Sequence, residues 1–213
     1  MYIPAHFEEK DPAVLHALIR SHPFGTWVYP GPAGPVANHL PLLLDAAPGG
    51  PAVLTGHVAR ANRAWMDCGP GQSLVIFQGP EAYITPSWYE AKKADGKVVP
   101  TWNYAVVHAY GAPKIHDDRE WLRAHVTRLT AVHEAGEESP WAPSDAPADY
   151  IDRMLAAIVG VEIPVERLEG KWKLGQNRTG ADRLAAASGL SRRPDEGSRE
   201  VGLLMARTGK PAG

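Results

Sequence analysis

Residues 51–65 read PAVLTGHVARANRAW, and this stretch places a strand directly before a short helix. The apolar residues at its start favour the strand, and the helix is expected to begin close to Asn62. A glycine, a histidine and an arginine stand at the junction. Such a junction is either an ordinary polar surface turn or a cradle for an anion. The cradle reading has a physical basis, because a helix start offers unpaired N–H groups and an arginine donates two parallel hydrogen bonds.

Strand-like runs continue on both sides of this stretch. They are rich in Val, Ile, Leu, Thr and aromatic residues, and Pro/Gly clusters separate them. Their spacing predicts a closed or nearly closed antiparallel sheet rather than repeated βαβ units, and therefore a mainly β member of the α+β class. The runs are GTWVYP (25–30), VANHLPLLL (36–44), AVLTGHV (52–58), SLVIFQG (73–79), EAYITP (81–86), TWNYAVVHAYGAPKI (101–115) and IVGVEIPVERLEGKWKL (158–174).

Helical periodicity appears in three places outside the strand runs. The first helix is predicted to begin at Asp11-Pro12 and to end before His22-Pro23. Two further helices are predicted over about 118–135 and 147–159. We therefore expect one domain over 1–190, with a helical insertion at about 118–159, followed by a polar basic tail over 191–213 that is helical in part and frayed at its end.

Length and composition exclude several classes of protein. The chain has 213 residues, which fits one large domain, and no run approaches the roughly 18 apolar residues of a membrane span. The N-terminal stretch MYIPAHFEEK lacks the pattern of a signal peptide. Cys68 is the single cysteine, so no internal disulfide can form. These observations predict a cytoplasmic protein that does not enter a membrane.

The charge is distributed unevenly along the chain. From Lys171 onward there are nine Lys or Arg against four Asp or Glu, although the whole chain carries a net charge of −2. A basic end can bind nucleic acid or nucleotide phosphates, or it can pack against the acidic body of its own chain or a partner. An overall pI of about 6.5 argues against strong autonomous DNA binding.

Most catalytic and metal-binding motifs are absent from the sequence. There is no HExxH, GxSxG, GxGxxG after a strand, or P-loop. His39 and His57 lie on separate predicted strands, and His125 and His133 are eight residues apart without an acidic partner on the same face. Two imidazoles without a carboxylate make a poor metal site, so no metal is predicted. Aromatic residues gather with polar companions in three segments, which suits either a core or a planar ligand.

Seven segments together resemble the signature blocks of the PaiB family, which is described as FMN-binding negative transcriptional regulators. The resemblance runs from Met1 to about Leu190. It implies a split β-barrel of Greek-key type, flanked by helices and related to pyridoxamine-phosphate oxidases and flavin reductases, which are homodimers with FMN at the subunit interface. The segments are MYIPAHF, HPFGTWV, NHLPLLL, GHVARANRAW, VIFQGPEAYITPSWY, VPTWNYAVVHAYG and KWKLGQNR.

The resemblance also implies a set of FMN-binding residues. Arg60 is expected to bind the phosphate, Trp88 and Tyr89 to wall the pocket, and KWKLGQNR to reach it from the second subunit. One departure is Arg63, because related turns more often carry proline after the asparagine. The full set is Asn38, His39, Leu40, Thr55, Gly56, His57, Arg60, Asn62, Trp88, Tyr89, Lys171, Gln176 and Asn177.

The resemblance indicates a cofactor more firmly than an activity. One hypothesis is a flavin-dependent regulator of transcription that acts without an obvious DNA-binding motif, through a small molecule or a protein partner. The second is an FMN-dependent oxidoreductase or flavin reductase, in which His39, His57 or His108 donates protons near the flavin ring. A third is a barrel that has lost its flavin. Direct DNA binding is weakly supported in all three.

Overall fold

The computed structural model describes residues 1–46 and 50–208. Contacts divide the chain into two compact units, neither of which is a continuous segment. Unit 1 comprises residues 1–18, 78–108 and 169–213, and unit 2 comprises residues 19–77 and 109–168. Each unit is described by itself below.

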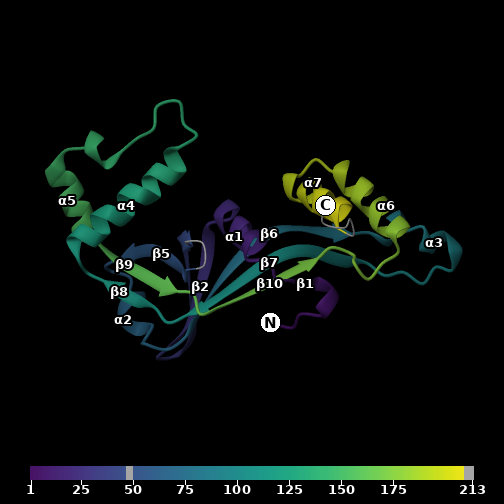
Figure 1. Ribbon diagram of the computed structural model, residues 1–213, viewed down its shortest axis with the longest axis horizontal. Coiled ribbons are helices and arrows are strands. Elements are labelled where there is room, and N and C mark those ends of the chain that lie inside the picture. Colours follow the sequence, from purple (N-terminus) through teal and green to yellow (C-terminus); the bar gives the residue numbers. More distant parts are fainter. Residues whose placement is uncertain (47–49, 209–213) are drawn as a thin grey trace. The chain divides into compact units, whose positions relative to one another are not determined.

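The strands form two antiparallel sheets (Figure 1). The six-stranded sheet has the order β1-β10-β7-β6-β2-β3, and the four-stranded sheet has the order β4-β5-β9-β8. Three strands contribute residues to both units. They are β6 (Ser73–Ile84), β7 (Thr101–Gly111) and β10 (Arg167–Lys173).

Unit 2 contains the four-stranded sheet and the helices that cover it. Its strands are β2 (Phe24–Gly31), β3 (Gly34–Pro41), β4 (Leu43–Ala46), β5 (Ala52–Ala59), β8 (Lys114–His116) and β9 (Ile158–Pro164). Its helices are α2 (Ala64–Asp67), α4 (Arg119–Glu134), η3 (Pro143–Asp145) and α5 (Ala148–Ala156). Helices α4 and α5 lie over one face of the sheet and contact β9 (Figure 1).

Alternation along the strands explains the core of unit 2. Trp27, Leu54 and Phe77 each point to the interior and are fully buried. Gly56 on β5 is part of this packing, since a Cβ there would collide with Leu42 and Leu40. A second cluster, formed by Leu122, Ile151 and Leu155, joins α4 to α5. Burying these apolar faces is what holds the helices on the sheet.

Unit 1 combines strand segments with short helices and a helical hairpin. Its elements are η1 (Ala5–Phe7), β1 (Glu8–Glu9), most of α1 (Pro12–Ser21), η2 (Pro86–Trp88), α3 (Ala91–Ala94), α6 (Gly180–Ser191) and α7 (Glu196–Arg207). Its core includes Ile84, Tyr89, Leu190, Val201 and Met205. Asp195 caps the start of α7 by accepting a hydrogen bond from the Ser198 amide.

The α+β, mainly antiparallel architecture predicted from the sequence is confirmed, with differences at strand boundaries. The runs 73–79 and 81–86 form one strand, β6, because Gly79 and Pro80 are accommodated within it. The run 36–44 is divided at Leu42, because residues up to Pro41 pair with β2 whereas Leu43 and the residues after it pair with β5. The predicted tail 191–213 contains α7, so its described part belongs to the core of unit 1, and 209–213 lie outside the described residues.

A helix that crosses a bilayer needs about 20 predominantly apolar residues, and this requirement can be applied to the described helices. None of them is long and apolar enough to cross a membrane.

Candidate functional site

Strand β5 carries two of the predicted site residues on the face that α4 covers. Side chains alternate along a strand, so Thr55 and His57 share one face while Leu54, Gly56 and Val58 share the other. Thr55 is 6% exposed and lines a cavity beneath α4. His57 is half-buried and contacts His125 of α4.

Strand pairing places three residues in a row under α4. His57 pairs with Gly160 of β9, and Gly160 pairs with His116 of β8. Gly160 has no side chain, which leaves space for the indole of Trp121; a Cβ at this position would overlap the ring. The indole therefore lies between His116, which stacks on it at 4.2 Å, and His125 at 5.3 Å.

His57 and His125 form a partly buried hydrogen-bonded pair. Their Nδ1 and Nε2 atoms are 3.2 Å apart, so one ring donates to the other. Burial lowers the pKa of His57. Burial, with the nearby charges of His57 and Arg128, lowers the pKa of His125 to about 4. Both rings are therefore neutral at pH 7, as expected for imidazoles removed from water.

The turn after β5 is organised by two asparagines. The Asn62 side chain donates to the Asn38 carbonyl oxygen at 2.7 Å and accepts from the Ala64 amide at 2.9 Å. Asn38, on β3, donates in turn to the hydroxyl of Tyr29. The N-cap residue of α2 is Arg63, whose side chain makes no capping bond, so Asn62 closes the turn before the helix rather than capping it as predicted.

Arg60 binds protein groups through most of its guanidinium. Both terminal nitrogens donate to Asp117, and Nε donates to the Ala156 carbonyl at 2.8 Å. One terminal nitrogen also donates to the Ile158 carbonyl at 3.0 Å. These bonds lower the pKa of the Asp117 carboxyl. The two parallel hydrogen bonds of Arg60 that were predicted to bind a phosphate are thus made to Asp117. The sequence did not predict Asp117 as a partner.

Hydrogen-bond capacity at this turn fits an anion. Arg60 has five N–H donors and each asparagine amide has two. The bonds formed within the described part of the chain use four donors of Arg60, one of Asn62 and one of Asn38. Each side chain therefore keeps one N–H, which suits a phosphate with several acceptor oxygens. Three single donors are therefore left at this turn, where the resemblance implied two parallel donors from Arg60 alone.

The predicted aromatic wall lies in unit 1 and packs into its core. Tyr89 is 3% exposed among the residues of α6 and α7, and Arg178 covers its ring at 4.9 Å. Trp88 packs on Gly189, where a Cβ would overlap the indole, and Arg193 lies over its other side at 5.2 Å. Core packing therefore accounts for both rings, and Tyr89 has too little exposed surface to wall a pocket.

The other predicted residues of unit 1 differ in their contacts. Lys171 donates to the Tyr2 carbonyl and lies over the ring of Tyr104. Gln176 closes its own turn by accepting from the Leu174 amide and donating to the Trp172 carbonyl. The side chain of Asn177 is exposed.

The remaining predicted residues of β3 have different environments. Leu40 is buried in the core, whereas His39 is exposed and lies beside Phe24 at 6.3 Å. His39 and His57 do not form a pair; the partner of His57 is His125. Among residues 1–46 and 50–208, no group of three or more His, Cys, Asp or Glu could hold a metal ion.

Comparison with known proteins supplies the family. The family described as "Putative FMN-binding domain" matches residues 1–167. The chain belongs to this family. Its split-barrel fold and its cofactor, FMN, are those that the resemblance to PaiB implied.

Relatives cover nearly the whole chain. The Bacillus subtilis protease synthase and sporulation protein PAI 2 is 31% identical over 96% of this chain and 96% of its own. An uncharacterized protein of Emericella nidulans is 32% identical over 99% of this chain and 98% of its own. Among solved structures, the flavocytochrome Anf3 of Azotobacter vinelandii has a TM-score of 0.61 at 11% identity, covering 84% of this chain and 73% of that one.

Two residues of the site were missed because their partners are distant in sequence. Asp117 is 57 residues from Arg60, and His125 is 68 residues from His57. His125 lies four residues after Trp121 on α4, a spacing that puts both on one helix face. That spacing was the available signal for Trp121 and His125, but it does not reveal which strand the face covers.

Proposed function

We propose that the phosphate of FMN binds at the turn between β5 and α2. This proposal rests on the unused donors of three side chains. After their hydrogen bonds within the described part of the chain are counted, one N–H donor remains on each of Asn38, Arg60 and Asn62. The guanidinium adds a positive charge, which shortens and strengthens a hydrogen bond to an oxyanion. Asp117 holds the guanidinium in place, so Arg60 meets the phosphate with one N–H and its charge.

A comparison of two ligands tests this site. Arg60→Ala should weaken FMN binding by roughly tenfold or more, because a charge-assisted hydrogen bond is lost. Riboflavin lacks the phosphate and should lose much less. Dissociation constants come from quenching of flavin fluorescence. Equal losses for FMN and riboflavin would mean that Arg60 supports only the shape of the turn, and the phosphate would have to bind elsewhere.

Asp117→Asn separates two roles for the carboxylate. If Asp117 orients Arg60, its replacement should weaken FMN binding, since the guanidinium then loses its alignment. If Asp117 competes with the phosphate for Arg60, the replacement should strengthen FMN binding. We expect weakening. Asp152→Asn is the matched control, because this carboxylate pairs with Arg119 and Arg123 of the same helical region but not with Arg60.

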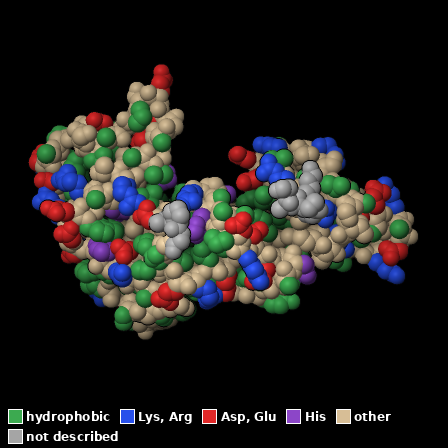
Figure 2. All heavy atoms as spheres, viewed as in Figure 1, with side chains coloured by type: hydrophobic (Ala, Val, Ile, Leu, Met, Phe, Trp, Pro, Cys, Tyr) green, Lys and Arg blue, Asp and Glu red, His purple; other side chains and the backbone are tan. Residues whose placement is uncertain are grey.

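We further propose that the protein is a flavin-dependent regulator that does not contact DNA directly. Several basic residues of its C-terminal part are held by other groups of unit 1. Arg178 and Arg193 lie over Tyr89 and Trp88, and Arg192 donates to Ser188. On the visible face, Lys and Arg side chains are interspersed with Asp and Glu rather than gathered into one patch (Figure 2). Nucleic-acid binding surfaces instead concentrate positive charge.

An FMN-dependent oxidoreductase is the second candidate. It is favoured by the likeness of the fold to a flavocytochrome over most of the chain. The discriminating measurement is anaerobic mixing of the FMN-loaded protein with NADH or NADPH, followed at the flavin absorbance. Reduction at many turnovers per minute would favour the enzyme, and a flavin that stays oxidised would favour the regulator.

We propose that the chain forms a homodimer through the open sheet face of unit 1. Asn103 of β7 points toward Met205 of α7, so the opposite face of this strand presents Trp102. Trp102 is 52% exposed and meets Tyr83 of β6 edge to face, with 6.2 Å between ring centroids. Exposed aromatic residues on a flat sheet commonly mark an interface between subunits.

A further inference from the structure

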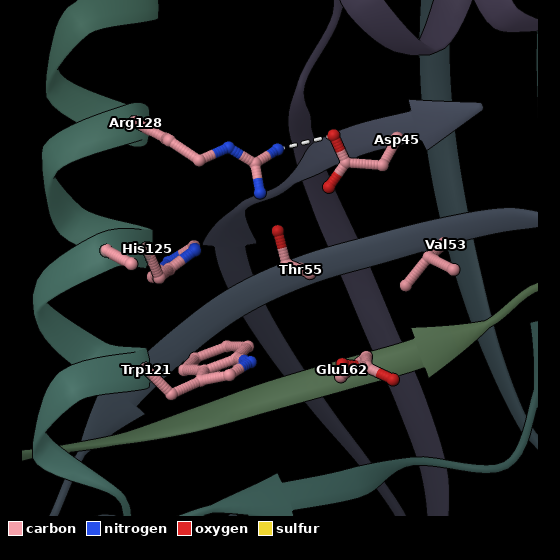
Figure 3. A pocket seen from close by; sticks show the side chains of 8 residues that line it. Asp45, Val53, Thr55, Trp121, His125, Arg128 and Glu162 are labelled. Atoms are coloured by element: carbon pink, nitrogen blue, oxygen red, sulfur yellow. Dashed lines mark hydrogen bonds and ion pairs between the residues drawn. The ribbon is translucent and has the colours of Figure 1, made fainter. Parts of the chain in front are cut away.

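A cavity of about 320 Å³ lies between α4 and the four-stranded sheet in unit 2 (Figure 3). Its floor is formed by β4, β5 and β9, and its wall is one face of α4. The size is at the lower end of the range for small-molecule sites. The cavity is lined by Asp45, Val53, Thr55, Trp121, Ala124, His125, Arg128 and Glu162.

Two buried polar atoms of the lining residues have no hydrogen-bond partner in the described part of the chain. They are the Thr55 hydroxyl oxygen and Nδ1 of His125. Thr55 is 6% exposed and His125 is 3% exposed. A buried polar group without a hydrogen bond is costly, and native structures seldom leave one unsatisfied. Two such atoms in one cavity point to a bound group that supplies their partners.

The charged groups of the lining already have partners, either within the lining or, for Glu162, outside it, which restricts the chemistry of that group. Arg128 donates to Asp45 through one terminal nitrogen, as Figure 3 shows. Glu162 is held by Lys114 and by His116. Both carboxylates therefore have cationic or imidazole partners. The Arg128 guanidinium has five donors, so further N–H groups remain to meet a ligand.

The groups that remain are mainly donors. Figure 3 shows the Thr55 hydroxyl on the side of the residue that faces Arg128 and Asp45. If His57 donates to Nε2 of His125, Nδ1 of His125 carries its proton and donates into the cavity. Beside these donors, Val53 and Trp121 offer apolar surface. Donors and apolar surface in one lining suit an amphipathic acid.

We propose that this cavity binds a small monocarboxylate with a compact apolar body. The carboxylate accepts hydrogen bonds from Arg128, Thr55 and His125, and the body lies against Val53 and Trp121. The site is separate from the turn proposed for the FMN phosphate and does not depend on that assignment. It gives the protein a second small-molecule ligand, held by the helical insertion and β5.

The test uses the full chain and sodium benzoate as the probe molecule. Isothermal titration calorimetry should give millimolar or tighter binding for benzoate. Benzamide, which has the same ring and no charge, should bind at least tenfold more weakly. Absence of benzoate binding at 10 mM ligand, or equal binding of benzamide, would overturn the proposal.

Thr55→Val identifies the site. It removes the hydroxyl at nearly constant volume and should weaken benzoate binding by about tenfold, in keeping with a hydrogen bond to a charged group. Thr127→Val is the matched control, because the Thr127 hydroxyl donates to Arg123 within the exposed part of α4. Unchanged binding in Thr55→Val would place benzoate elsewhere and refute the assignment.

A second variant tests the same cavity independently, in case Thr55→Val does not fold. Ala124→Leu adds volume at the cavity wall on an exposed helix position, where leucine is a good helix former. It should abolish benzoate binding while FMN binding stays at the wild-type level. Titration in the presence of saturating FMN should leave benzoate binding in place. Competition between the two ligands would mean that FMN itself occupies the cavity, and the proposal of a separate site would fail.

Discussion

His125 makes the stability of the protein depend on pH in a direction that can be worked out from its burial. Its folded pKa is lowered to about 4, against 6.5 for a solvated histidine. Between pH 4 and pH 6.5, His125 is therefore mostly protonated in the unfolded chain and mostly neutral in the folded chain. Since the unfolded state holds more protons there, the free energy of unfolding rises with pH and falls as the solution is acidified through 6.5 toward 4.

The magnitude follows from the same two values. Acidification from pH 7 to pH 5 should cost about 2 kcal/mol of the free energy of unfolding through His125 alone. The lowered pKa of His57 acts in the same direction. His125→Gln cannot take up the proton, so its free energy of unfolding should fall by about 2 kcal/mol less than that of the wild type over this interval.

The assay is urea denaturation at pH 7 and pH 5, followed by far-UV circular dichroism. The comparison is the change between the two pH values within each protein, so a general destabilisation of the variant cancels. His133→Gln is the matched control on the same helix, where the side chain is exposed, and it should follow the wild type. If wild type and His125→Gln lose the same free energy, His125 is not held neutral by burial and the reasoning is refuted.

Three further outcomes are expected. Gly160→Ala should lower the free energy of unfolding by about 1–3 kcal/mol by displacing Trp121, measured by urea denaturation, and an unchanged midpoint would contradict the packing under α4. The wild type should be a dimer by light scattering at micromolar concentration and Trp102→Glu a monomer, whereas a monomeric wild type would disprove the proposed interface. Duplex DNA should bind more weakly than about 1 μM at physiological salt, so tight sequence-selective binding would refute a regulator without DNA contacts.

The helices and strands could be predicted well because the residue patterns that favour them lie within a few neighbouring positions. The apolar run of β5 and the Asp11-Pro12 helix start depend on residues next to one another, and both the strand and the helix are present. The division of residues 36–44 was missed because its cause is distant. The chain pairs with β2 up to Pro41 and with β5 from Leu43 onward, and that change of partner depends on the fold rather than on the residues beside Leu42.

The contacts of the candidate site were even harder to predict, because they join residues that are distant in the sequence. The sequence predicted that Arg60 donates two parallel hydrogen bonds to a phosphate, whereas in the structure both terminal nitrogens donate to Asp117. A guanidinium binds a carboxylate and a phosphate with similar geometry, so residue type alone cannot separate Asp117 from a ligand. Likewise, His57 was recognised as a polar residue on β5, and its partner became visible only when α4 was placed over the sheet.

The helical insertion is therefore part of the site that we propose rather than an accessory to it. Arg60 lies at the end of β5, Asp117 follows β8, and the carbonyls of Ala156 and Ile158 lie where α5 gives way to β9. The Arg60 amide adds a bond to the Ala157 carbonyl. One side chain thus ties the ends of three strands together. A shift of α4 and α5 would move these partners, and the turn that bears Asn62 would lose the contacts that fix its donors.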